Sequence, residues 1–292
     1  MPIVPPDESE SFLSRCPARP GQALYAHLHE TAMTTEALLR PVGLGTVGRV
    51  IAWLHDIGKM SKECTGYMEL AGRDAEKASQ LRGSIDHSTA GAQFIWRNME
   101  AGRQYTAASF MRQIMALCVA SHHHPSLIDC WRGPTEKQAI FLKRMGESTE
   151  KTHYDEIVAS LTDADKRFYH ALLSDEAVVS EMDALHHAIG KVGANLGDRS
   201  FLYGLMTRCV YSALTEADYR SASGQGSLTH RSVPNWGAMQ LSLENYLAHF
   251  SNAGELNALR ASMSLRCLQA GPCARGSGVW RCRLGQVKHS PV

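Results

Sequence analysis

Short segments containing His and Asp are spread along this chain, and each lies at or beside the end of an apolar helical pattern. They are His27, His55-Asp56, Asp86-His87-Ser88, His122-His123 and Asp218. Imidazoles and carboxylates in this proportion suit divalent first-row transition metals. Enough of them are present to hold two ions with one bridging carboxylate, an arrangement that breaks phosphodiester bonds. The chain therefore needs a fold that gathers helix ends and turns around one site.

Hydrophobic periodicity predicts helices along most of the chain. Residues 47–54 recur at helical spacing, so this helix would present the His55-Asp56 pair at its C-terminal end. Residues 61–85 are expected to hold a short helix and a loop, and residues 146–153 and 221–235 are expected to be loops. Strand alternation and repeats are not found, so the sequence predicts an all-α fold. Helices are expected over residues 21–39, 47–54, 88–99, 107–121, 135–145, 163–173, 176–192, 199–219, 237–250 and 254–269.

Bulk composition narrows the class of protein. A hydrophobic fraction of 44% and a charged fraction of 20% are ordinary for a globular protein with a sizeable core. The net charge of +1 gives no overall field that would attract nucleic acid, although a local basic groove is compatible with it. No apolar run reaches the roughly 18 residues of a membrane span, so no membrane association is expected. The Cys residues form no C-x-x-C pair and no signal-peptide pattern is found, so we expect reduced thiols and a cytoplasmic protein.

Each candidate residue also has an ordinary structural role open to it. A lone His is more often a hydrogen-bonded core or surface residue than a metal ligand. Asp56 could pair with Lys59, although a carboxylate at a helix C-terminus is unfavourable unless a cation compensates it. His122-His123 could cap a helix, and Asp86-His87 could form a simple turn. Asp218 could form an ion pair with Arg208 or Arg220.

Taken together, the residues follow the order H…HD…H…HH…D, and few explanations other than a metal site account for this order. At this point the chain resembles the HD-domain metallohydrolase superfamily and, more narrowly, is similar to the HD nuclease domain of CRISPR type I effector nuclease-helicases. The resemblance covers roughly residues 20–270 and implies an HD-domain helical bundle with a two-metal site on helix ends and turns. The stretches that carry it are Ala26-His27-Leu28, His55-Asp56-Ile57-Gly58-Lys59, Asp86-His87-Ser88-Thr89-Ala90-Gly91-Ala92, Ala120-Ser121-His122-His123 and Ala217-Asp218.

The resemblance implies a ligand set for two divalent ions. Mn, Fe, Co or Ni would fit such a His-rich site, whereas Mg prefers oxygen ligands and fits less well. The first ion would be held by His27, His55, Asp56 and Asp218, and the second, bridged by Asp56, would be completed by His87, His122 and His123.

The same resemblance implies the chemistry. The oxygen shared through Asp56 would hold the ions close, and a metal-bound hydroxide would attack phosphorus. Lys59 would stabilise the developing charge, with a solvated lysine as the alternative. Asp86 and Ser88 are candidates for orienting the imidazoles, and Ser88 is also a candidate helix N-cap.

Three ambiguities remain in the pattern. His27 competes with His29 for the first ligand position, and the spacing to Ala32 favours His27. The pair His186-His187 has no acidic motif beside it and is interpreted as structural. The segment Gly43-Leu44-Gly45-Thr46-Val47-Gly48 matches G-x-G-x-x-G, but it follows a helical pattern instead of a strand, which argues against dinucleotide binding.

The domain organisation predicted from the sequence has three parts. An irregular lead-in over residues 1–20 precedes one domain over residues 21–270, and an irregular tail covers residues 271–292. The family would continue into a helicase motor that begins with a phosphate-binding G-K-T loop, which this sequence lacks. Possible codons of the tail, read two nucleotides out of register, permit such a loop. A frameshifted or truncated gene is therefore one hypothesis, and a stand-alone nuclease subunit with a disordered tail is the other.

The function implied by the resemblance is metal-dependent cleavage of single-stranded DNA in CRISPR interference, an antiviral defence, together with an RNA-guided surveillance complex and a helicase domain or subunit. Binding would be led by the DNA backbone, and the candidate contacts are Lys59, Lys62, Arg97 and Arg103. One alternative is an HD phosphohydrolase that acts on nucleotides or cyclic nucleotides in a closed pocket. The other is a non-catalytic, metal-stabilised docking module, which would bind metal without turnover.

Overall fold

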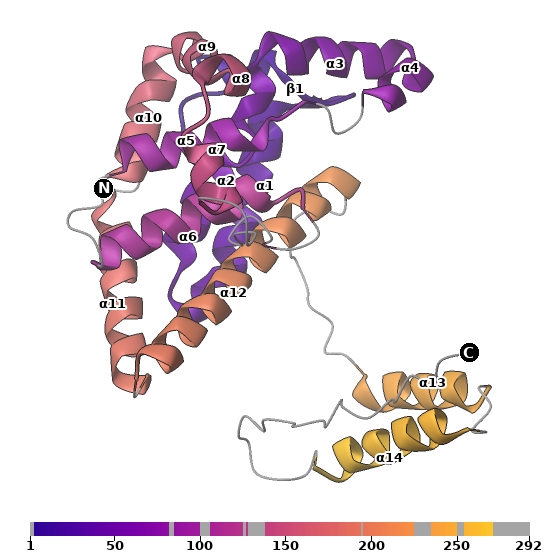
Figure 1. The fold of residues 1–292 in the computed structure, drawn as a ribbon. Coiled ribbons are helices and arrows are strands. Elements are labelled where there is room, and N and C mark those ends of the chain that lie inside the picture. Colours follow the sequence, from indigo (N-terminus) through magenta and orange to yellow (C-terminus); the bar gives the residue numbers. More distant parts are fainter. Residues whose placement is uncertain are drawn as a thin grey trace. The chain divides into compact units, whose positions relative to one another are not determined.

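The computed structural model describes residues 3–81, 85–99, 106–124, 127, 138–193, 195–224, 235–249 and 254–270. The chain divides into two compact units, Met1–His230 and Arg231–Val292. Helices account for nearly all of the described regular structure (Figure 1), which confirms the all-α class predicted from the sequence. No helix in these described ranges is both long and apolar enough to cross a membrane.

The first unit is built around long helices joined by short ones. The predicted helices over residues 107–121, 163–173 and 176–192 coincide with α6, α10 and α11. The elements in chain order are η1 (Phe12–Arg15), β1 (Pro17–Arg19), β2 (Gln22–Ala23), α1 (Leu24–Leu39), η2 (Arg40–Val42), α2 (Gly45–Leu54), η3 (Ile57–Met60), α3 (Lys62–Arg73), α4 (Ala75–Gln80), α5 (Ser88–Asn98), α6 (Ala107–Ser121), α7 (Ile140–Met145), α8 (Thr149–Thr152), α9 (Tyr154–Ser160), α10 (Asp163–Leu173), α11 (Glu176–Val192) and α12 (Leu196–Ser223).

Two segments are more helical than the sequence indicated. Residues 61–85 contain both α3 and α4, because Ser61 accepts a hydrogen bond from the Cys64 amide and Asp74 accepts one from the Lys77 amide, so each helix has its own N-cap. The expected loop over residues 146–153 contains α8, which is a single turn and too short to show a periodic pattern. The expected loop over residues 221–235 falls mostly outside the described residues, but α12 extends into it as far as Ser223.

The expectation of an irregular lead-in over residues 1–20 was wrong in its second half. This stretch contains η1 and β1, and β1 pairs antiparallel with β2. Leu13 is fully buried in the core. Asp165 at the start of α10 accepts hydrogen bonds from the Ser11 hydroxyl at 2.6 Å and from the Phe12 amide at 3.0 Å. Burial of Leu13 and this buried polar anchor fix the segment in place.

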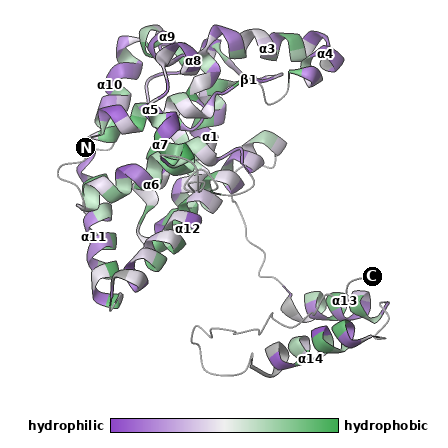
Figure 2. Ribbon diagram, in the orientation of Figure 1, coloured by the Kyte–Doolittle hydropathy of each residue, from purple (hydrophilic) through white to green (hydrophobic). Residues whose placement is uncertain are grey.

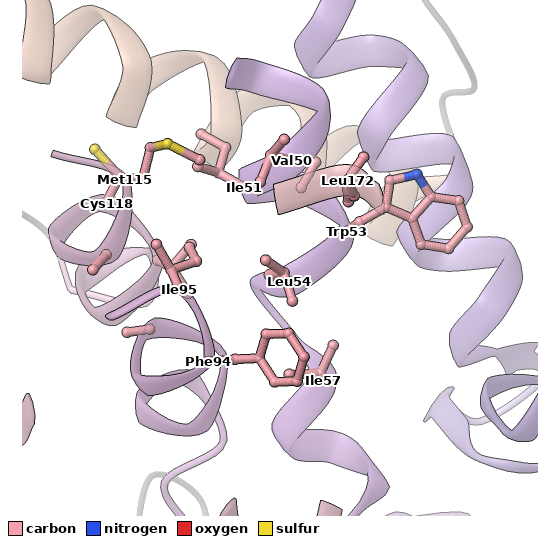
Figure 3. Packing of buried hydrophobic residues seen from close by; sticks show 14 of the residues in the cluster. Val50, Ile51, Trp53, Leu54, Ile57, Phe94, Ile95, Met115, Cys118 and Leu172 are labelled. Atoms are coloured by element: carbon pink, nitrogen blue, oxygen red, sulfur yellow. The ribbon is translucent and has the colours of Figure 1, made fainter. Parts of the chain in front are cut away.

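The core of the first unit lies around α2. All residues of this helix except Thr46 and Arg49 are buried, as expected for a helix with neighbours on every side. It packs against α1, α5, α6, α11 and α12. Figure 3 shows its apolar side chains meeting those of α5 and α6. On another face Trp53 meets the ring of Phe168 edge-on, with the ring centroids 5.0 Å apart. Consequently the C-terminal end of α2 is held at the centre of the unit.

The second unit contains α13 (Trp236–Ala248) and α14 (Glu255–Ala270). The side chains described on these helices are almost all exposed. Polar and apolar residues alternate along both helices (Figure 2), so neither presents one clear apolar face. This division differs from the single domain expected over residues 21–270, because helical periodicity alone does not show which helices share a core. The expected tail over residues 271–292 lies outside the described residues.

Candidate metal centre

Seven side chains predicted from the sequence as ligands converge at the ends of helices in the first unit. His27 lies on α1 and Asp218 on α12, while His87 is the N-cap of α5. They form two groups whose ligand atoms lie within 4.8 Å of one another: His27, His55, Asp56 and Asp218, and Asp56, His87, His122 and His123. Asp56 belongs to both groups.

The two carboxylate oxygens of Asp56 face different groups of imidazoles. Its Oδ2 lies 3.2 Å from His27 Nε2 and 3.4 Å from His55 Nε2. Its Oδ1 lies 3.3 Å from His122 Nε2, and the Nε2 atoms of His87 and His123 are 3.6 and 3.7 Å away. One fully buried carboxylate thus lies between two sets of nitrogen ligands. This geometry is what a bridging carboxylate between two ions requires.

Asp218 completes the first group and is not paired with either of the arginines that its sequence neighbourhood offered. Its Oδ1 lies 3.3 Å from His27 Nε2 and 3.7 Å from His55 Nε2. Arg220 instead pairs with Glu216 at 2.6 Å, and Arg208 donates to the Gly204 carbonyl oxygen. The carboxylate of Asp218 is therefore directed to the imidazoles.

Backbone carbonyl groups orient the two most buried imidazoles. His55 Nδ1 lies 2.7 Å from the Ala52 carbonyl oxygen, and His122 Nδ1 lies 2.7 Å from the Val119 carbonyl oxygen. A carbonyl oxygen only accepts hydrogen bonds, so each Nδ1 carries the proton and each neutral ring has its lone pair on Nε2. His122 does occupy the C-cap position of α6, as a helix-capping role predicts, while its Nε2 remains directed at Asp56.

Two buried polar atoms at the centre of the cluster have no hydrogen-bond partner. They are Asp56 Oδ1 and His122 Nε2, which lie 3.3 Å apart without hydrogen-bond geometry. Buried polar atoms are nearly always satisfied, by protein, water or an ion. An anionic oxygen and a nitrogen lone pair that lie this close together are suitable ligands for a divalent cation. The donor set therefore fits the metal that the sequence pattern implied.

The predicted role of Asp86 and Ser88 in orienting imidazoles was wrong. Asp86 Oδ1 accepts hydrogen bonds from the backbone amides of Ser88 and Thr89 and so stabilises the start of α5. Ser88 is the first helical residue, and the N-cap position belongs to His87. The Ser88 hydroxyl donates to the Ala120 carbonyl oxygen at 3.2 Å, and the Arg144 guanidinium contacts the same carbonyl at 2.7 Å. These contacts join the segments that carry the second group.

Lys59 lies within the cluster and is buried, not solvated. Its Nζ lies 2.6 Å from Asp56 Oδ2 and only 9% of the residue is exposed. Burial tends to raise the pKa of Asp56, but the positive charge of Lys59 and the neighbouring imidazoles outweigh it and hold the pKa well below the usual range. Burial tends to lower the pKa of Lys59, and Asp56 reverses this, so the net shift is upward. Both groups are therefore ionised, and a salt bridge to Lys59 coexists with the imidazole contacts of Asp56.

His27 and His87, one from each group, differ in their electrostatics. Burial acts to lower the pKa of His27, but hydrogen bonds to Asp218 and Asp56 outweigh it and raise the pKa. Burial, assisted by the charge of His123, lowers the pKa of His87 to about 4 despite the attraction of Asp56. His87 is therefore neutral near pH 7, which is the form that binds metal.

The residues left ambiguous by the sequence are also placed. His29 is exposed and stacks on Tyr25, so His27 is the residue that enters the cluster. His186 lies outside it, beside Tyr203. The amides of Thr46 and Val47 in the G-x-G-x-x-G segment each donate to the Glu181 carboxylate at 2.9 Å. That helix N-terminus is thus occupied by an anion of the protein itself.

The candidate DNA contacts have different environments. Lys59 faces Asp56, and the Arg97 guanidinium lies 4.4 Å from the centroid of the Tyr154 ring. Lys62 has an exposed side chain at the start of α3. Arg103 lies outside the described residues. Of the three that the structure describes, Lys59 is therefore the one that contacts the cluster.

Sequence reasoning missed two residues that support the cluster from behind. The Ser221 hydroxyl lies 3.0 Å from His27 Nδ1, and Glu30 lies 2.7 Å from the same hydroxyl. Ser221 follows Asp218 by three residues, which places both on one side of α12. A polar residue one helical turn from a predicted ligand is the signal that would have identified it.

Comparisons with protein-family models, with curated proteins and with solved structures gave no match. The function of this chain therefore has to be inferred from its own residues.

Metal binding is expected to stabilise the fold, because the ligands come from five helices and converge only in the folded chain. At an ion concentration about 100 times the Kd, each site adds about 2.7 kcal/mol. For a unit of this size we expect a rise of roughly 5–10 °C in Tm per ion. Thermal unfolding in Mn²⁺ and in EDTA measures this rise in Tm. His122→Ala is compared with the control His187→Ala, which replaces an exposed His on α11. An equal rise in both variants would contradict the assignment of His122 as a ligand.

Proposed function

We propose that this chain is a metal-dependent nuclease that hydrolyses phosphodiester bonds of single-stranded DNA with two divalent transition-metal ions. The observation that carries the proposal is the position of Asp56, with one oxygen facing each group of imidazoles. The role in CRISPR interference, with an RNA-guided complex and a helicase, comes from the resemblance of the sequence motifs.

Each of the two groups of side chains would hold one ion. His27, His55 and Asp218 with Asp56 Oδ2 would hold one ion, and the other imidazoles with Asp56 Oδ1 would hold the second. When bound, such a pair of ions supplies activation of the attacking water and stabilisation of charge on the phosphoryl oxygens. Asp56 belongs to both groups and so holds them next to each other. The Lys59 ammonium contributes a further positive charge beside Asp56 Oδ2, where it would attract a phosphate.

Exposure within the cluster favours a polymeric substrate over a mononucleotide. His55, Asp56 and His122 form a buried floor. His123 has 43% of its side chain exposed and His87 has 20%. Across the described ranges of the chain, the second group therefore opens to solvent at one edge. An open edge admits a continuous strand, whereas the nucleotide phosphohydrolase alternative needs an enclosing pocket.

The test is cleavage of circular single-stranded DNA by the purified chain, with Mn²⁺, Co²⁺, Ni²⁺ and Mg²⁺ compared after removal of bound metal. We expect nicking and fragmentation with the transition metals, weaker cleavage with Mg²⁺, and weaker cleavage of duplex than of single strands. Circular substrate without free ends separates endonuclease from exonuclease action.

Parallel assays with mononucleotides and cyclic dinucleotides distinguish the alternatives. Hydrolysis of these and not of DNA would replace the nuclease by the phosphohydrolase. Two bound ions per chain with no turnover of any substrate would favour the docking module.

A further inference from the structure

His27 is the one ligand of the first group whose Nδ1 contacts a side chain in place of a backbone carbonyl. The Ser221 hydroxyl lies 3.0 Å from this nitrogen, and only 4% of Ser221 is exposed. The same oxygen lies 2.7 Å from Glu30 Oε2. Glu30 follows His27 by three residues on α1 and is exposed to solvent. A chain of two hydrogen bonds thus connects the imidazole with a surface carboxylate.

The direction of these hydrogen bonds follows from counting protons. A serine hydroxyl has one proton, and a carboxylate only accepts, so Ser221 donates to Glu30. The Ser221 oxygen then accepts from His27, which places the proton of the neutral ring on Nδ1. In the metal-free chain, Nε2 of His27 donates to the carboxylates of Asp56 and Asp218, whose oxygens lie 3.2 and 3.3 Å away. When an ion is bound in place of that proton, the proton held on Nδ1 leaves the Nε2 lone pair free to act as the ligand.

We propose that Glu30, acting through Ser221, is a positioning residue that fixes His27 in the tautomer and orientation needed to bind the first metal ion. A carboxylate behind a ligand imidazole also makes the ring a stronger donor to the metal. This inference rests on the two-ion site of the proposed function and is independent of the substrate.

The N-terminal hairpin holds this hydrogen-bonded chain in place. The Arg19 guanidinium of β1 donates to the Ser221 carbonyl oxygen at the end of α12. The Gln22 amide of β2 donates to the Ser221 hydroxyl at 3.2 Å and to Glu30 Oε2 at 3.1 Å. Around these groups lies a small hollow of about 320 Å³, lined by Arg19, Gln22, Glu30 and Ser221 among others. Arg19, which lies in the segment expected to be an irregular lead-in, and Gln22 just after it therefore support the first group.

The test is metal titration of the full chain in three variants: Ser221→Ala, Glu30→Gln and the control Glu36→Gln. Glu36 lies on the same helix and pairs with Arg40 near its end, so its substitution removes a charge from α1 without touching His27. Calorimetry with Mn²⁺ gives the stoichiometry and the two affinities. We expect Ser221→Ala to weaken one of the two ions by about 10–100-fold and to leave the other unchanged. Glu30→Gln should weaken the same ion by a smaller factor, because its amide oxygen can still accept from Ser221.

A spectroscopic readout separates positioning from general destabilisation. In the Zn²⁺-loaded chain, long-range ¹H–¹⁵N correlation spectra report which ring nitrogen of His27 carries the proton. We expect an Nδ1–H signature in the wild type and in Glu36→Gln, and loss of the His27 zinc signature in Ser221→Ala. Equal weakening of both ions, or wild-type titrations in both Ser221→Ala and Glu30→Gln, would overturn the proposal.

The variants distinguish a failure to fold, and a loss of nuclease activity, from a loss of His27 positioning. If Ser221→Ala fails to fold, Glu30→Gln at the exposed end of the chain decides the question alone. A wild-type chain that binds two ions but cuts no DNA counts against the nuclease, and the positioning role is still decided by the titrations.

Discussion

Asp56→Asn is expected to abolish DNA cleavage and to empty both ion sites. The amide keeps the size of the carboxylate, so packing at the end of α2 is preserved. It replaces one of the two ligand oxygens by an NH₂ group, which cannot bind a cation, and removes the only negative charge shared by the two groups. We expect the rate to fall by at least about 10³-fold, equivalent to about 4 kcal/mol of transition-state stabilisation.

The same substitution also affects stability, in a direction that the pKa of Asp56 fixes. The folded-state pKa lies well below the model-peptide value of 3.8, so ionised Asp56 stabilises the fold above that pH, and the contribution is lost as the pH falls through the folded-state pKa. At neutral pH, Asp56→Asn removes it and leaves the Lys59 ammonium buried without its partner.

The measurements are metal content by mass spectrometry and the initial rate on circular single-stranded DNA. Asp165→Asn is the matched control, because Asp165 is equally buried but lies outside the cluster. Its carboxylate accepts hydrogen bonds from Ser11, Phe12 and Thr162. The control should lose stability and keep two ions per chain. Cleavage by Asp56→Asn at the wild-type rate would refute the bridging role.

The helices and the candidate ligand residues could be predicted from the sequence because they follow short-range rules. Apolar spacing located α2 and α6, and the candidate ligands stand at or just past the ends of these helices, where the pattern stops. All seven predicted ligands meet in the structure.

The supporting residues were not readable because their partners are distant in sequence. Ser221 and Glu30 are separated by 191 positions, and the Arg144 contact with Ala120 spans 24. Serine and glutamate on helices are ordinary surface residues, so their spacing of one helical turn from Asp218 and His27 is the one local signal of the link, and it does not show that the two residues meet. Asp86 illustrates the opposite error. Its proximity to His87 suggested that it orients an imidazole, but its carboxylate instead accepts hydrogen bonds from the amides at the start of α5.

The boundary between the two units was also hidden from the sequence. The patterns over residues 237–250 and 254–269 predicted helices, and α13 and α14 are present. Periodicity identifies a helix but not the core that covers it, and almost all of the side chains described on both helices are exposed. Contacts between helices carry this information, and no local rule encodes them.

Two glycines within the His-containing motifs explain how the ligand segments come so close together. A Cβ at Gly91 of α5 would lie 1.9 Å from the carbonyl oxygen of Leu54, the residue just before His55. A Cβ at Gly58 would lie 2.0 Å from the carbonyl oxygen of His87. Both obstacles are backbone atoms next to ligands, so they cannot move aside without displacing the ligands themselves. Gly91 therefore sets the distance between α5 and the end of α2, and Gly58 sets the distance between η3 and the start of α5.

Gly91→Ala is consequently expected to lower the free energy of unfolding by about 3 kcal/mol or more and to reduce metal binding. The matched control is Gly190→Ala on α11, where a Cβ would meet nothing within 4 Å. There the same change should stabilise the chain by up to about 1 kcal/mol, because alanine is the better helix former. Urea unfolding in EDTA measures the packing effect without metal, and titration with Mn²⁺ measures the ligand geometry. If Gly91→Ala were as stable as Gly190→Ala and bound two ions with wild-type affinity, α2 and α5 would have room for the methyl group, and the close approach of the ligand segments would need another cause.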